Sequence, residues 1–160
     1  MAGHPKDRKR FTTNIALLER ASTVALCPAP DRAVFYAEDE GASLAATFVA
    51  DNPGHQRLDE LLQLSPEGKA LWQELIGGGR PWSAVEEVWW ELSWRLARAA
   101  KGHVHVFGPA RLIEDRPLSE YRHKYVTGAY ANTVFEKVEL PELEQNPSVT
   151  GITYNGRPFG

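Results

Sequence analysis

An isolated carboxylate late in the sequence is the first residue whose type and setting suggest chemistry. Glu139 follows Val138 in a stretch, residues 134–140, whose apolar and β-branched composition is typical of a buried strand. Pro141 comes two residues later, and because proline cannot donate to a strand ladder, we expect the strand to end near Glu139. Ligands of open parallel sheets bind beyond the carboxyl ends of the strands. The pattern therefore predicts either a reactive carboxylate at a sheet edge or one that only faces water.

A cluster of tryptophans is the second candidate. Trp89, Trp90 and Trp94 fall within six residues of one expected helix. Trp89 and Ser93 are four residues apart and therefore share a helix face. Aromatic residues at this spacing usually pack into the core, yet three indoles exceed what one apolar stripe can bury. We expect at least one of them to border a cleft.

Other polar residues support weaker functional interpretations. His103 and His105 alternate on one face of an expected strand, which suits either two metal ligands or two structural histidines. No third ligand stands at a suitable spacing, so no metal site is predicted. Asp39, Asp59 and Glu60 offer an acid and a base for hydrolysis, but spacing alone does not bring them together. The sequence contains neither a phosphate-binding glycine loop nor a nucleophile elbow.

Composition limits the classes of function. The 160 residues are 42% apolar and include five tryptophans, enough for the core of one domain. A formal net charge of −3 argues against a polyanion-binding surface, so nucleic acid is not an expected partner. No apolar run is long enough to predict a membrane span. The lone Cys27 excludes an internal disulfide. Residues 1–10, rich in Lys and Arg, are expected to form a flexible leader before a single domain over residues 11–160.

Hydrophobic periodicity predicts helices first and strands later. A capping-box pattern beginning at Ser83 predicts the start of the longest helix. Pro141 suits the first position of a one-turn helix. The expected fold is α/β in an α+β arrangement, with a helical N-terminal half packed on a small, mainly parallel C-terminal sheet. The expected helices cover residues 11–23, 41–50, two stretches within 56–76, and 83–102; the expected strands cover 103–107, 134–140 and 149–154.

Two segments resemble the ADP-ribosyl cyclase family, whose animal members cleave the nicotinamide–ribose bond of NAD. VEEVWWELSWRLARAAKGHVHVF, residues 85–107, is similar to the family helix that carries a Trp and, four residues later, a Ser, followed by a VHV strand. TVFEKVEL, residues 133–140, is similar to the segment in which a Thr and a Phe precede the strand bearing the catalytic glutamate. Weaker similarity extends the resemblance over residues 34–154.

The resemblance implies an ADP-ribosyl cyclase-like fold and an NAD+ glycohydrolase that uses no cofactor, with NAD+ or NADP+ as the substrate. It assigns the catalytic role to Glu139. The animal disulfides are absent, as in bacterial relatives that are toxin domains. Asp59 is shorter than the family Glu it matches, which makes cyclisation less expected than hydrolysis. The implied substrate-binding residues are Trp89, Ser93, Tyr36, Asp59, Thr133 and Phe135.

The same resemblance implies a biological setting. The domain is expected to be a monomer carried by a larger, contact-delivered bacterial effector, to deplete NAD in the target-cell cytoplasm, and to be neutralised by a cognate immunity protein. Two other functions stay open. An ADP-ribosyltransferase toxin would use the same carboxylate, although its usual second Glu and Ser-Thr-Ser pattern are not evident. A noncatalytic binding module would share the fold without needing the acid.

Overall fold

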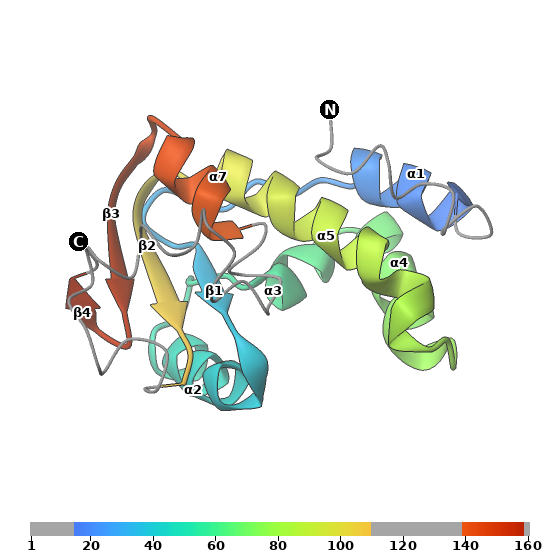
Figure 1. Ribbon diagram of the computed structural model, residues 1–160, viewed down its shortest axis with the longest axis horizontal. Helices are drawn as coiled ribbons and strands as arrows, with labels where there is room; N and C mark the ends of the chain where they lie inside the picture. Colours follow the sequence, from blue (N-terminus) through green and yellow to red (C-terminus); the bar gives the residue numbers. More distant parts are fainter. Residues whose placement is uncertain (1–14, 110–138, 159–160) are drawn as a thin grey trace.

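The computed structural model describes residues 15–109 and 139–158, and these form a mixed α/β domain (Figure 1). The predicted leader, residues 1–10, lies outside this part of the chain. In chain order the elements are α1 (Ile15–Thr23), β1 (Val34–Tyr36), α2 (Glu38–Asp51), α3 (Leu58–Leu62), α4 (Pro66–Gly77), α5 (Trp82–Ala99), β2 (Gly102–Phe107), α7 (Leu140–Gln145), β3 (Val149–Tyr154) and β4 (Arg157–Pro158).

The strands form a single sheet in the order β1-β2-β3-β4. The first three strands are parallel and β4 is antiparallel to β3. A mainly parallel sheet was predicted, and this is confirmed. The expected restriction of the sheet to the C-terminal half is wrong, because β1 comes from the N-terminal half and pairs with β2.

Helix α5 organises the core. Its buried positions Val85, Val88, Leu92 and Leu96 recur every three or four residues, which places them on one face of the helix. Helices α1 and α4 lie toward the end of α5 that is distant from the sheet, whereas α7 lies beside its C-terminal half (Figure 1). This long helix therefore joins the helical part of the domain to the sheet.

The N-terminal end of α2 lies close to the end of β2. The amide of Ala37 donates to the carbonyl oxygen of Phe107 at 2.9 Å. A Cβ atom at Gly41 would lie only 2.4 Å from that same oxygen, so this approach requires glycine. The contact fixes the segment that follows β1, where Glu38 has a left-handed backbone with φ 61°. A non-glycine residue with left-handed backbone dihedrals stores strain, and such residues often lie at functional sites.

Two boundaries predicted from the sequence are wrong. Glu139 and Leu140 do not end a strand: Glu139 has helical dihedrals and precedes α7, which begins at Leu140. Residues 134–138 of that predicted strand lie outside the described part. Helix α5 begins at Trp82 with Pro81 at the N-cap position, so it starts before the capping position predicted at Ser83. The predicted one-turn helix at Pro141 is confirmed as α7.

Within residues 15–109 and 139–158, none of the helices combines the length and apolar character that crossing a bilayer requires.

Candidate active site

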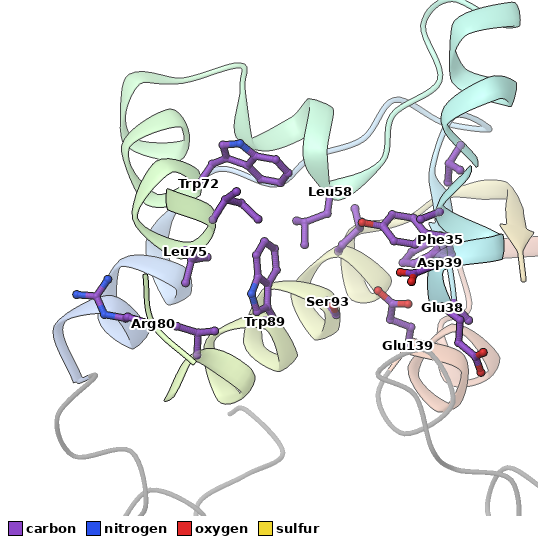
Figure 2. Close-up of a pocket in the computed structure, with 17 residues that line it drawn as sticks. Phe35, Glu38, Asp39, Leu58, Trp72, Leu75, Arg80, Trp89, Ser93 and Glu139 are labelled. Atoms are coloured by element: carbon purple, nitrogen blue, oxygen red, sulfur yellow. The ribbon is translucent and has the colours of Figure 1, made fainter. Parts of the chain in front are cut away.

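A cavity of about 650 Å³ opens at the carboxyl end of β1 (Figure 2). Its walls come from β1 and the start of α2, from α3 and α4, from one face of α5, and from Glu139. This volume lies in the range of about 300–1,000 Å³ that is typical of small-molecule sites. The cavity is therefore large enough to hold a substantial part of a nucleotide.

Glu139 is the buried acid of this cavity. Only 7% of the residue is exposed, although it is a carboxylic acid. Burial raises the pKa of Glu139 to about 8, and a hydrogen bond with Ser93 opposes that rise only in part. No cation among the described residues lowers this pKa. Glu139 is therefore mainly in its neutral form at pH 7.

The predicted partners of Glu139 on α5 line the same cavity. Ser93 is 5% exposed and Trp89 is half-buried. Their four-residue spacing puts them one helical turn apart on the face that looks into the cavity. Ser93 lies between Trp89 and Glu139 (Figure 2). The structure thus brings together an indole, a hydroxyl and a buried carboxyl group along one wall.

A second indole belongs to this wall and was not predicted. Trp72 of α4 packs edge-on against Trp89, with ring centroids 6.1 Å apart and planes at 89°. Both rings line the cavity, with Leu75 beside them (Figure 2). Val85 is a further apolar residue of the lining. Spacing gives no signal for Trp72, because its place in the wall depends on its contact with Trp89 of α5.

Tyr36 lines the cavity, and Asp59 lies behind it. The Tyr36 hydroxyl donates to Asp59 Oδ1 at 3.3 Å. The pKa of Tyr36 is raised, first by burial and then by the negative charge of Asp59, with a smaller effect of Glu139. Burial also raises the pKa of Asp59, against the lowering effect of Arg57. Asp59 therefore orients Tyr36 and does not itself line the cavity.

The remaining acids of the predicted acid–base set are separated. Asp39 lines the cavity beside Glu38, at the end that Glu139 occupies (Figure 2). Glu60 instead accepts two hydrogen bonds from Arg57 Nε, at 2.9 and 3.1 Å. The Glu60 carboxylate is therefore paired with Arg57 at the start of α3. These acids do not converge as a hydrolytic pair.

Charge is unequally distributed along the cavity. Glu38, Asp39 and Glu139 gather at one end, whereas Arg80 lies at the other, beyond Trp89 (Figure 2). Arg80 is already engaged, because its Nη2 is 3.7 Å from Glu74 Oε1. The end of the cavity that holds these three acids therefore suits a positively charged group better than an anion.

The other predicted residues lie elsewhere. His103 and His105 are on the sheet face that contacts α2. The ring centroid of His105 lies 5.0 Å from the ring centroid of Phe48 and 5.0 Å from that of His55. In the part of the chain that the structure describes, no three or more His, Cys, Asp or Glu side chains are arranged to hold a metal ion. Thr133 and Phe135 lie outside the described residues.

No protein-family model matches the sequence, and a search of curated proteins finds no similar one. The functional argument therefore depends on the side chains of the cavity.

The raised pKa of Glu139 predicts a pH-dependent effect of Glu139→Gln on stability. Because the pKa is about 8 in the folded chain and near 4.5 as a reference, the folded state binds more protons between these values. The contribution of Glu139 to the free energy of unfolding is therefore complete below pH 4.5 and is lost as the pH rises through 8. Glutamine keeps the neutral amide at every pH, so between pH 5 and pH 8 the variant should gain on the order of 3–4 kcal/mol in stability relative to wild type.

Urea denaturation of both proteins at these two pH values measures this difference. Wild-type and variant stabilities that change in parallel would show that Glu139 ionises normally in the folded chain.

Proposed function

We propose that this protein is an NAD+ glycohydrolase that converts NAD+ and water into nicotinamide, ADP-ribose and a proton. The observation that carries the proposal is the shared cavity: buried Glu139 and the indole of Trp89 lie on one wall, with Ser93 between them. The resemblance of residues 85–107 and 133–140 to the ADP-ribosyl cyclase family supports the same assignment independently of the geometry.

Few residues are needed for this reaction. As the bond between the nicotinamide nitrogen and ribose C1′ breaks, its electron pair goes to the ring and positive charge develops on the ribose, as in glycosidase transition states. Nicotinamide leaves as a neutral molecule, so no general acid has to protonate it. A single carboxylate near the ribose can stabilise the charge, and water then attacks C1′ and releases a proton. Glu139 takes this role.

The apolar end of the cavity is suited to the leaving group. The nicotinamide ring of NAD+ is flat and cationic, and an aromatic face stabilises such a ring by roughly 1–2 kcal/mol when water is excluded. Trp89 supplies this contact, and Trp72 holds the Trp89 ring edge-on at 6.1 Å. Tyr36 lines the same cavity, where its hydroxyl is held by Asp59.

The raised pKa of Glu139 is compatible with this role. A cation bound within a few ångströms lowers the pKa of a carboxyl group, because it favours the charged form. The pyridinium of NAD+ brings such a charge, and the ribose gains more of it in the transition state. We infer that substrate binding promotes ionisation of Glu139, because the positive charge of the bound substrate compensates the negative charge of the carboxylate.

The resemblance also supports a biological role. The domain would belong to a contact-delivered bacterial effector, deplete NAD in the target-cell cytoplasm, and be blocked by a cognate immunity protein. A hydrolase that uses a common metabolite would endanger its producer, which explains the need for such an inhibitor.

Incubation with NAD+ tests the activity. We expect nicotinamide and free ADP-ribose in equal amounts, measured by chromatography. Glu139→Gln should lower kcat by about 10²–10³-fold, the usual effect of removing one preorganised group that stabilises the transition state. Glu67→Gln, an exposed acid of α4, is the matched control and should keep wild-type activity.

ADP-ribose attached to protein would instead indicate a transferase, and unchanged NAD+ would indicate a binding module. Normal turnover by Glu139→Gln would show that another group stabilises the charge.

The pH dependence of the reaction follows from the pKa of about 8 for Glu139. If the ionised carboxylate is the active form, kcat/KM should rise about tenfold per pH unit below this value and level off above it. The midpoint for kcat should lie at a lower pH, because the bound cation lowers the pKa. Initial rates between pH 5.5 and pH 9 measure both profiles. A kcat/KM that decreases as the pH rises would mean that the protonated acid is active.

A further inference from the structure

Helix α7, which follows Glu139, is too short to hold its own position. It spans six residues, Leu140–Gln145, whereas isolated helices shorter than about 12–15 residues are marginal in water. Its place must therefore come from contacts with the rest of the fold. Leu140 and Leu143 are buried in the core, but apolar contacts do not fix the rotation of a helix as well as directional bonds do.

Directional contacts run along α7 and α5 in the same order. Ser93 bonds to Glu139, and Trp94 Nε1 donates to Glu142 Oε1 at 3.0 Å. At the far end Asn146 Nδ2 donates to the carbonyl oxygen of Ala97 at 2.9 Å. We call these three contacts the α5–α7 ladder. Because Glu139, Glu142 and Asn146 are three and four residues apart, they share one face and lock α7 to α5.

The contact between Trp94 and Glu142 is the middle one and lies next to the site. Trp94 directly follows Ser93, and Glu142 is three residues from Glu139. Arg98 adds to it, with Cζ 4.8 Å from the Trp94 ring centroid and Nε 3.9 Å from Glu142 Oε2. The Arg98 side chain is 56% exposed, so its ion pair should contribute little. The indole hydrogen bond is therefore the main directional contact of Glu142.

We propose that Trp94 and Glu142 are positioning residues that set where the Glu139 carboxyl group lies in the cavity. This inference rests on the proposed function for its effect on turnover. Neither side chain lines the cavity, so both act through α7 and not on the substrate. Without their hydrogen bond, the start of α7 can rotate or shift, and Glu139 loses its fixed distance from Ser93 and from the ribose. Displacement by about 1 Å can cost up to 100-fold in rate.

A double-mutant cycle on kcat tests the pair. Trp94→Phe removes the donor and keeps an aromatic ring, and Glu142→Ala removes the acceptor. Each variant should lower kcat about tenfold with little change in KM, and the double variant should be no slower than either single variant, because both remove one interaction. Glu142→Gln keeps an oxygen acceptor and should stay within about threefold of wild type. Glu19→Gln, an exposed acid of α1, controls for loss of charge.

A second measurement does not depend on activity. Titration of the Glu139 side-chain carboxyl carbon by NMR should give a lower midpoint in Trp94→Phe and Glu142→Ala than in wild type, because a released carboxyl group reaches water. If the wild-type protein leaves NAD+ intact but the two variants still have lower midpoints than wild type, the proposed function fails and the positioning role stands. Unchanged midpoints, or a double variant whose losses in kcat multiply, would overturn the inference.

Discussion

Burial of one carboxyl group is the constraint on which the site depends. A carboxylate taken from water into an apolar setting is strongly disfavoured, and a single hydroxyl partner compensates only in part. Glu139 is in that situation, since it is 7% exposed and Ser93 is its hydrogen-bond partner. The described residues therefore do not fully compensate the negative charge of an ionised Glu139. Under the proposed function, the positive charge of the bound nicotinamide ring would compensate this carboxylate and so promote its ionisation.

The surrounding residues maintain this condition. Two arginines of the described part of the chain are already paired with other acids: Arg57 Nε donates to Glu60, and Arg80 Nη2 lies 3.7 Å from Glu74. Neither is free to neutralise Glu139. Burial also raises the pKa of Asp59, the acid that accepts the hydrogen bond of the Tyr36 hydroxyl. Within residues 15–109 and 139–158, no side chain therefore supplies a positive charge that lowers the pKa of Glu139.

The features that were predictable from the sequence are those set by local spacing. The common face of Trp89 and Ser93 follows from a four-residue separation, and the short helix near Pro141 follows from the helix-start preference of proline. The environment of Glu139 was predicted less well. Its alternating neighbours have the pattern of a strand, yet its own backbone is helical because α7 packs on α5.

Trp72 could not have been identified from spacing, since its position in the site depends on the packing of α4 against α5. The same reason applies to the ladder between α5 and α7, whose partners Trp94 and Glu142 are 48 residues apart. Contacts of this kind depend on the tertiary fold, and periodicity contains no information on them.

The crystal structure of the Glu139→Gln variant with NAD+ tests the central claim most directly. The account predicts the nicotinamide ring against the face of Trp89, with a ribose hydroxyl within hydrogen-bond distance of the residue 139 amide. A dinucleotide bound elsewhere, or bound in the cavity with its adenine against Trp89 and its nicotinamide ribose far from residue 139, would contradict the account.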